Sequence, residues 1–178
     1  MNKSISALTI AIVCCLTSII GSWAAPVSEA RFDNFTQEDG LSNNMVQCIY
    51  QDKEGWMWFG SSQGLNRYDG YKFRTYRSDD GSSHAMMGSL VRCVYQDKKG
   101  NYWVGTENGG LNKFDLHTES FTKIRIRNSD KVYSANSICE DRNGRLWVGT
   151  EQGLCYLDNH GNLQYYNVQS DQHDGLID

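Results

Sequence analysis

The stretch that decides the fold is Val46-Gln-Cys-Ile-Tyr-Gln-Asp52-Lys-Glu-Gly55-Trp-Met-Trp58-Phe-Gly60, because the chain repeats it twice. The later copies are Val91-Arg-Cys-Val-Tyr-Gln-Asp97-Lys-Lys-Gly100-Asn-Tyr-Trp103-Val-Gly105 and Ala135-Asn-Ser-Ile-Cys-Glu-Asp141-Arg-Asn-Gly144-Arg-Leu-Trp147-Val-Gly149. The repeated tryptophans recur after 45 and then 44 residues. Self-similarity at such a period is typical of a repeat architecture, in which each repeat is one small structural unit.

Each repeat predicts four short strands joined by tight turns. The first strand is the Val-x-Cys-Ile-Tyr run, whose apolar residues fall on both faces, as expected between neighbouring sheets. Asp-x-x-Gly is a hairpin turn, in which the carboxylate accepts from backbone N–H groups two residues on and the glycine takes positive φ. The second strand carries the tryptophan, and the glycine after it allows close packing. The expected fourth strands are Tyr71 to Tyr76, Ser120 to Ile126 and Leu163 to Val168.

Four strands per 44 to 45 residues is typical of a β-propeller blade. We therefore predict an all-β chain of about three four-stranded blades, with blade 1 at 37–80, blade 2 at 81–130 and blade 3 at 131–178. The end of blade 3 includes Asp174-Gly-Leu-Ile-Asp178, which echoes the lead-in Asp39-Gly-Leu-Ser-Asn43 and predicts the start of a further blade. A solenoid of β-hairpins is the alternative fold.

The first 36 residues predict two segments outside these blades. Residues 1–24 have a basic start, an apolar run and small residues before Ala25, which is the layout of a secretory signal peptide. An uncleaved membrane anchor is the alternative. Residues 25–36 contain Arg31-Phe-Asp-Asn-Phe-Thr36, which is similar to a fourth strand and has no first three strands before it. We expect it to act as a closing outer strand on a further blade.

Charge and cysteine content narrow the function classes. The net charge of −4 argues against nucleic acid or an anionic membrane surface as a partner. The predicted mature chain keeps Cys48, Cys93, Cys139 and Cys155, with no Cys/His pairing at zinc spacing. Equivalent residues of packed sheets lie roughly 10 Å apart, whereas a disulfide needs Cα atoms within about 7 Å. Buried free thiols are therefore favoured over disulfides.

Several motifs together resemble the two-component regulator propeller repeat. They are Asp39 to Asn44, Tyr50 to Gly60, Gly64 to Gly70, and Gly109 to Asp115, whereas blade 3 departs by placing Cys155-Tyr156 where Asn-Arg or Asn-Lys is expected. The resemblance implies the periplasmic sensor propeller of a hybrid two-component histidine kinase, which often detects oligosaccharides. It also implies further blades, a kinase and a dimer in a full-length parent. The kinase motifs themselves are not found in this sequence.

The candidate ligand residues are polar amides in the loops that join strands two and three and lead from one blade to the next. Amide side chains in such loops could hydrogen-bond sugar hydroxyls. The alternative is that they are ordinary polar loop residues with no ligand. These residues are Asn44, Gln63, Asn108 and Gln152.

Residues that recur in every repeat are expected to stabilise the blade structure rather than to bind a ligand. The tryptophans are expected in the core rather than as sugar platforms, and the turn aspartates lack a second acid at calcium-loop spacing. These structural positions are Asp52, Gly55, Trp58, Gly60, Asp97, Gly100, Trp103, Gly105, Asp141, Gly144, Trp147 and Gly149.

The scattered histidines form no catalytic set, so we predict no catalytic residues, metal or cofactor. The preferred hypothesis is a periplasmic, non-catalytic segment of a two-component sensor that binds a carbohydrate. A non-functional remnant of a truncated sensor gene is one alternative. A propeller lyase is the other, and it would need a histidine and acidic residues converging with a metal.

Overall fold

The computed structural model describes residues 32–78, 81–128, 131–158 and 161–166. The chain divides into two compact units, 1–34 and Phe35–Asp178, and every helix and strand described below belongs to the second. The predicted signal peptide and the lead-in to a further blade lie outside the described residues.

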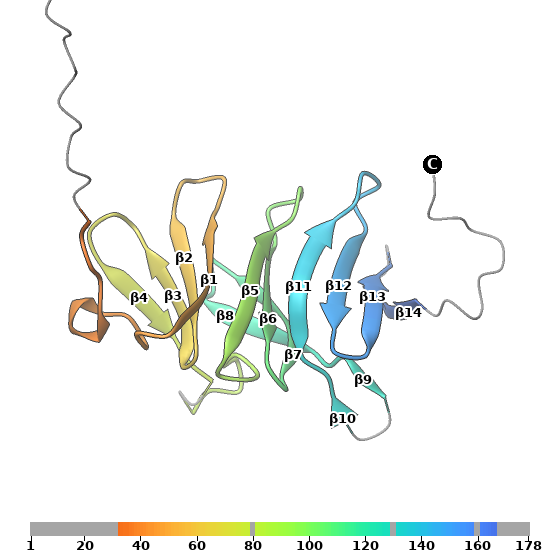
Figure 1. Ribbon diagram of the computed structural model, residues 1–178. Helices are drawn as coiled ribbons and strands as arrows, with labels where there is room; N and C mark the ends of the chain where they lie inside the picture. Colours follow the sequence, from red (N-terminus) through yellow and green to blue (C-terminus); the bar gives the residue numbers. More distant parts are fainter. Residues whose placement is uncertain (1–31, 79–80, 129–130, 159–160, 167–178) are drawn as a thin grey trace, which may run out of the picture. The chain divides into compact units, whose positions relative to one another are not determined.

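The second unit contains three four-stranded antiparallel sheets, each in simple up-and-down order (Figure 1). The first sheet is β1 (Val46–Gln51), β2 (Met57–Ser61), β3 (Gly64–Tyr68) and β4 (Phe73–Tyr76). The second is β5 (Val91–Gln96), β6 (Tyr102–Thr106), β7 (Gly110–Asp115) and β8 (Ser120–Ile124). The third is β11 (Ala135–Glu140), β12 (Leu146–Thr150), β13 (Gly153–Leu157) and β14 (Leu163–Tyr166). The predicted all-β propeller blades are thereby confirmed.

Two smaller elements lie outside the blades. β9 (Arg127–Asn128) and β10 (Lys131–Val132) pair as a short ribbon in the connection from blade 2 to blade 3. The 3-10 helix η1 (Gln37–Asp39) precedes blade 1, and Thr36 caps it through a capping box with Asp39. No strand forms over the described residues 32–36, and Phe35 instead packs on Tyr68 and Phe73 of blade 1. The closing-strand role stays a prediction, because its expected partner is a blade beyond this sequence.

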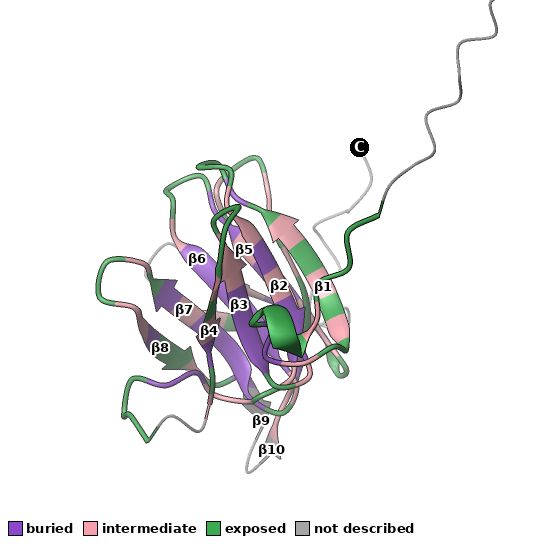
Figure 2. Cartoon of the chain, turned by 90° about the vertical axis from the view of Figure 1, so that its left-hand side faces the viewer, coloured by how far each residue is buried: buried purple, intermediate pink, exposed green. Residues whose placement is uncertain are grey.

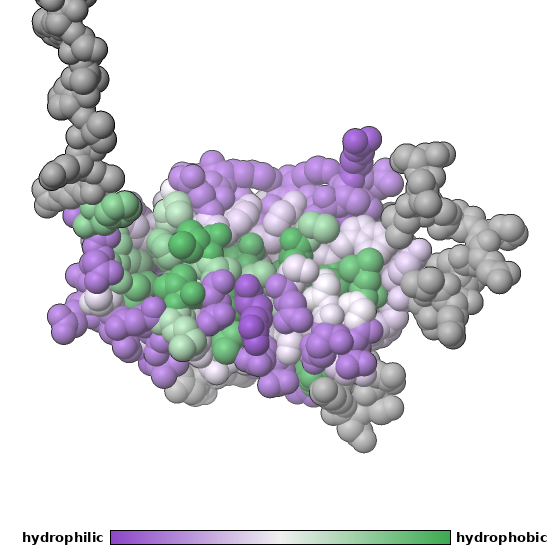
Figure 3. Space-filling view, viewed as in Figure 1, coloured by the Kyte–Doolittle hydropathy of each residue, from purple (hydrophilic) through white to green (hydrophobic). Residues whose placement is uncertain are grey.

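The blades pack through the faces of their sheets, with β1, β5 and β11 side by side (Figure 1). Blades 1 and 2 bury one apolar cluster, centred on Trp58, Leu65 and Phe114. Blades 2 and 3 bury a second, centred on Trp103, Leu111 and Val148. Apolar surface also runs across the middle of the face shown in Figure 3, between polar ends of the strands. Each blade is therefore stabilised mainly by its neighbours, as in other repeat architectures.

The Asp-x-x-Gly turn does more than the sequence predicts. In every blade, one carboxylate oxygen accepts from the backbone N–H four residues on, at 2.8 Å in Asp52 and Asp97 and 2.9 Å in Asp141. The other oxygen accepts from the indole Nε1 of the repeated tryptophan six residues on, at 2.7, 2.9 and 3.0 Å. The expected bond from the backbone N–H two residues on also forms, from Asn143 to Asp141 Oδ1 at 2.9 Å and from Lys99 to the Asp97 carboxylate. The turn therefore fixes the tryptophan ring as well as the hairpin.

These turns predict a loss of stability in acid. Burial would raise the pKa of Asp97, but hydrogen bonds from Trp103 and Asn101 outweigh it and hold that pKa below 3.8. The Trp147 indole and the Arg145 N–H likewise lower the pKa of Asp141. A lowered folded-state pKa contributes stability that is present above the unfolded pKa and lost as pH falls through the folded value.

We therefore expect the free energy of unfolding to fall as pH drops below about 4. Urea unfolding followed by circular dichroism at a series of pH values measures it. Asp97→Asn should flatten the slope in this window, whereas the control Glu38→Gln, at an exposed carboxylate outside these turns, should keep it. An equal slope in Asp97→Asn and the unmodified chain would contradict the assignment.

Candidate functional site

The loops that join strands two and three gather at one end of the sheets, with the connections between blades. Figure 1 shows this end below the strands, where β9 and β10 also lie. A hydrogen bond ties the loops of blades 2 and 3 together, because Asn108 N donates to Ser134 Oγ at 3.1 Å. Within blade 3, Ser134 N donates to Glu151 Oε2 at 2.8 Å. Glu107 N donates to the Leu90 carbonyl at 2.9 Å within blade 2. The end is thus a connected surface rather than a set of separate loops.

The four predicted ligand residues all lie at this end and all are exposed. Gln63 and Gln152 occupy equivalent turns, where Ser61 Oγ and Thr150 Oγ1 each accept from their backbone N–H at 3.1 Å. Asn108 sits in the left-handed region with φ 54°, which asparagine tolerates better than most residues. Asn44 differs, because its Oδ1 already accepts from Gln37 N at 2.8 Å. Three amides are therefore presented to solvent, and the fourth partly serves the fold.

Two buried amides at the same end were missed by the sequence reasoning. Asn66 Oδ1 accepts from Ser42 N at 2.7 Å, and its Nδ2 donates to Ser42 Oγ at 2.9 Å. Asn112 repeats this arrangement on the lead-in of blade 2, where its Oδ1 accepts from Met87 N at 2.8 Å. Both side chains are 0% exposed. They anchor the lead-in loops, and the repeated Gly-Leu-Asn triplet was the signal that could have found them.

Blade 3 replaces this anchor by a thiol. Cys155 occupies the equivalent position, is 1% exposed, and its Sγ lies 3.6 Å from the Val148 carbonyl. A thiol is a weak donor that cannot hold a lead-in loop from both sides as an amide does. The departure noticed in the sequence therefore removes a loop anchor from blade 3.

Polar cavities lie at the seams between blades, near the opposite end of the strands. This end is uppermost in Figure 1. The cavity between blades 1 and 2 has a volume of about 360 Å³ and is lined by Glu54, Gln96, Tyr102 and Lys113 among others. The Tyr102 hydroxyl lies 2.9 Å from Asp52 Oδ2 and 3.1 Å from Glu54 Oε2. Burial and the hydrogen bond to Asp52 raise the pKa of Tyr102, so this hydroxyl keeps its proton and ties the two blades together.

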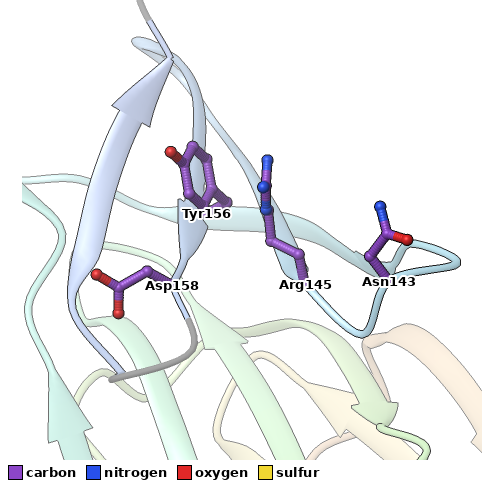
Figure 4. A pocket seen from close by; sticks show the side chains of 4 residues that line it. All are labelled: Asn143, Arg145, Tyr156 and Asp158. Carbon is purple, nitrogen blue, oxygen red and sulfur yellow. The ribbon is translucent and has the colours of Figure 1, made fainter.

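Blade 3 has a related cavity on its outward face, of about 180 Å³ (Figure 4). Asn143, Arg145, Tyr156 and Asp158 line it, and the Arg145 guanidinium stacks 4.5 Å above the Tyr156 ring. A second cavity of about 180 Å³ lies between blades 2 and 3 and includes Asp97, Lys113 and Glu140. Charges of both signs face these spaces, which suits hydrogen bonding to a polar ligand better than apolar binding.

Two of the four described thiols are held in an unreactive, protonated state. All four thiols are free, as predicted, but the predicted burial is complete only for Cys155: Cys48 and Cys93 are partly buried, and Cys139 is exposed because no described blade covers its face of blade 3. Burial raises the pKa of Cys93 to about 12 and that of Cys155 to about 11, so these two remain protonated and are poor nucleophiles. Within the described ranges, no three His, Cys, Asp or Glu side chains come together as metal ligands. No helix in that part of the chain is long and apolar enough to span a membrane.

Comparison with known families finds the two component regulator propeller in this chain. The model of that family matches at residues 40–63, 86–108 and 128–152. Each match covers the lead-in, the first two strands and the turn after them, and so falls once on each blade. These are also the segments that carry the Asp–Trp hydrogen bond.

Three known proteins show the context of the repeat. A curated relative, histidine kinase P4 of Formosa agariphila, is 42% identical over 65 residues, which are 36% of this chain and 5% of the kinase. The extracellular domain of the hybrid two component system BT3049 from B. thetaiotaomicron is 33% identical, with a TM-score of 0.69 over 78% of this chain and 20% of that domain. Virginiamycin B lyase from Staphylococcus aureus is similar in fold alone, at 17% identity, a TM-score of 0.57, and coverage of 78% of this chain and 45% of the lyase.

Proposed function

Because the three repeats of this chain belong to the two component regulator propeller family, we propose that it forms part of a ligand-sensing propeller in a two-component signalling protein. The observation that carries the proposal is the match of all three blades to the family, together with the 33% identity to an extracellular sensor domain. The chain spans a small part of both relatives, so signalling to a kinase is proposed for a longer protein.

We place the working compartment outside the cytoplasm. The similar structure is an extracellular domain, and residues 1–24 have the composition of a signal peptide for export to the periplasm. We propose that the propeller binds a ligand and transmits the signal, and that it does not catalyse a reaction. The raised pKa values of Cys93 and Cys155 mean that neither is an activated thiol nucleophile.

The ligand we propose is an oligosaccharide bound at the loop end that carries Gln63, Asn108 and Gln152. Primary amides offer both donors and an acceptor, which match the alternating donors and acceptors of sugar hydroxyls. The three side chains are exposed and come from different blades, so a ligand of several sugar units could touch more than one of them. The tie between Asn108 N and Ser134 Oγ holds two of these blades in register.

Isothermal titration calorimetry with a panel of glycan-derived oligosaccharides tests this proposal. Gln63→Ala together with Gln152→Ala should weaken binding by roughly tenfold, since each lost hydrogen bond contributes about 0.5–1.5 kcal/mol. Asn108 is left unchanged because of its positive φ.

Asn143→Ala is the matched control, because it removes an exposed amide from the opposite end of the strands. Loss of binding in this control alone would place the ligand at the other end and contradict the proposed site. A folded chain that binds none of the panel would contradict carbohydrate sensing and favour a non-functional remnant.

A further inference from the structure

The first strand of every blade carries one extra residue at the same place. β1, β5 and β11 each pair with the strand that follows them through a β-bulge near their start. The extra residues at the three bulges are Gln47, Arg92 and Asn136. Bulges redirect a side chain out of the regular strand pattern and are frequent next to functional sites. Each blade therefore contributes one side chain that lies outside the regular alternation of its first strand.

The backbone of the bulge repeats in the three blades, but its side chain does not. The residue before the bulge is apolar in every blade, and the residue after it is a cysteine or a serine. The bulge residues themselves are an amide, a guanidinium and a shorter amide. Residues that stabilise the blade recur unchanged, as the aspartate and tryptophan of the hairpin do. A position that keeps its geometry and changes its chemistry is better suited to ligand recognition than to blade packing.

The three bulges lie at the loop end of the strands, beside the proposed oligosaccharide site. In blade 2, the residue before Arg92 pairs with Thr106, where the turn that carries Asn108 begins. The register is the same in blades 1 and 3, which places Gln47 and Asn136 next to the equivalent turns. Because β1, β5 and β11 lie side by side, these residues form a row across the blades (Figure 1). We call Gln47, Arg92 and Asn136 the bulge row.

The bulge row is accessible from solvent. Gln47 and Asn136 are exposed, and the side chain of Arg92 is 38% exposed. Figure 2 shows the same difference along the strands: β1 and β5 carry exposed or intermediate residues, whereas every residue of β6 is buried. A ligand at the loop end can therefore reach side chains of the first strands, but not those of β6.

Arg92 uses only part of its capacity to bind an anion within the described structure. Its Nη2 lies 3.1 Å from Glu107 Oε1 of the same blade, and its Nε is buried with no hydrogen-bond partner among the described residues. A guanidinium has five N–H donors and binds a carboxylate best through two parallel hydrogen bonds. The side chain of Glu107 is 36% exposed, so the ion pair is open to solvent and contributes little to stability. Arg92 is therefore a cation that can exchange its partner for another acidic group.

Two further arginines add positive charge at the loop end. Arg77 directly follows β4 and Arg125 directly follows β8, where those strands reach the loop end, and both are exposed. Glu151 lies at the same end in blade 3, but its Oε2 already accepts from Ser134 N at 2.8 Å. Positive charge around a site raises the local concentration of anionic ligands and the rate at which they associate. The charges at this end therefore favour an acidic ligand over a neutral one.

We propose that the bulge row binds an acidic oligosaccharide, in which the carboxylate of a uronic acid replaces Glu107 on Arg92. Hydroxyl groups of the neighbouring sugar units bind Gln47 and Asn136, because primary amides offer both donors and an acceptor. The planar fork of an arginine matches the geometry of a carboxylate. The inference rests on the proposed carbohydrate-sensing function and narrows its ligand to sugars that carry a carboxylate.

Isothermal titration calorimetry of the chain with matched pairs of sugars tests the proposal. Each pair consists of a short oligosaccharide of galacturonic, glucuronic or mannuronic acid and its carboxyl-reduced, neutral form. We expect an acidic member to bind roughly tenfold more tightly than its neutral partner, with a preference that weakens as salt is added. Equal or tighter binding of the neutral members would overturn the inference and leave carbohydrate sensing intact. A folded chain that binds no member of any pair would contradict both.

Arg92→Gln removes the charge and keeps a polar side chain. It should lower the affinity for the acidic member roughly tenfold and leave the affinity for the neutral partner unchanged. Arg74→Gln is the matched control, because Arg74 also pairs with a glutamate, Glu119, but lies on β4 rather than on a first strand. It should keep both affinities. Circular dichroism establishes that each variant is folded, and a folded Arg92→Gln chain that still prefers the acidic member would overturn the proposal.

Glu107→Gln tests the exchange of partners on Arg92. The substitution removes the carboxylate that competes with the sugar and that repels it. The affinity for the acidic member should therefore rise severalfold, while the affinity for the neutral partner stays the same. The effect is opposite in sign to that of Arg92→Gln, although both substitutions break the same ion pair. Unchanged or weaker binding of the acidic member would contradict the proposed replacement of Glu107.

Discussion

Trp58→Ala is expected to lower the free energy of unfolding by about 3–5 kcal/mol, which is the usual cost of emptying a buried aromatic site. The side chain is 0% exposed, and its ring centroid lies 5.1 Å from that of Tyr102 and 5.6 Å from that of Phe114, both in blade 2. Its Nε1 also donates to Asp52 Oδ2 at 2.7 Å. The substitution would therefore open a cavity at the seam and leave a carboxylate oxygen with one partner fewer.

Trp147→Ala is the matched control for this prediction. Trp147 holds the same place in blade 3 and makes the same bond, from Nε1 to Asp141 Oδ2 at 3.0 Å. Its ring contacts are Tyr156 and Tyr166 of its own sheet, and it is only half-buried. We expect a clearly smaller loss, measured by urea unfolding of both variants. Equal losses would show that the neighbouring blade contributes little to the value of the tryptophan.

Gly105→Ala is expected to cost about 1–3 kcal/mol or more, because it overfills the seam between blades 2 and 3. A Cβ at this position would lie 2.5 Å from Cys93 Sγ and 2.6 Å from the Ala135 carbonyl oxygen. The sulfur belongs to the same sheet, but the carbonyl belongs to the backbone of blade 3 and cannot rotate away. The strain must therefore move one blade against the other.

Gly149→Ala makes the same change where no further blade follows in the described structure. There the contact below 3 Å is with Ser137 Oγ, at 2.4 Å, which can turn aside. We expect a small loss in this control, measured by thermal unfolding. Cys93→Ala should rescue Gly105→Ala only in part, since the Ala135 carbonyl remains. Complete rescue would assign the whole cost to the sulfur and contradict the seam explanation.

The fold could be predicted from the sequence because the same strand and turn pattern occurs three times in the chain. Asp52, Gly55 and Trp58 recur at fixed spacing in the later copies, and a turn, a strand and a core ring are local consequences of those residue types. The predicted closing strand at 25–36 could not be decided in the same way. A strand needs a partner, and Phe35 packs on blade 1 instead of continuing a ladder.

Only some residues of the candidate site could be predicted from the sequence. The positions of Gln63, Asn108 and Gln152 in exposed turns follow from the strand pattern. The burial of Asn66 and Asn112 does not, because an amide in a strand can face solvent or bind a loop from elsewhere in the chain. For Asn66 that loop holds Ser42, 24 residues earlier in the chain.

The sequence by itself determined the blade: its four strands, its turn and its tryptophan, all set by contacts within about 45 residues. Only the tertiary structure decided how far each repeated tryptophan is buried. The Asp–Trp bond spans six residues, but the full burial of Trp58 and the partial burial of Trp147 depend on whether a neighbouring blade covers the ring. The same holds for Lys53, which lies in a local turn but donates to Gln96 Oε1 and to the Asp97 carbonyl of blade 2. Turns and hydrogen bonds within a blade therefore repeat with the sequence. The burial of a side chain depends instead on which surface of a neighbouring blade packs against it.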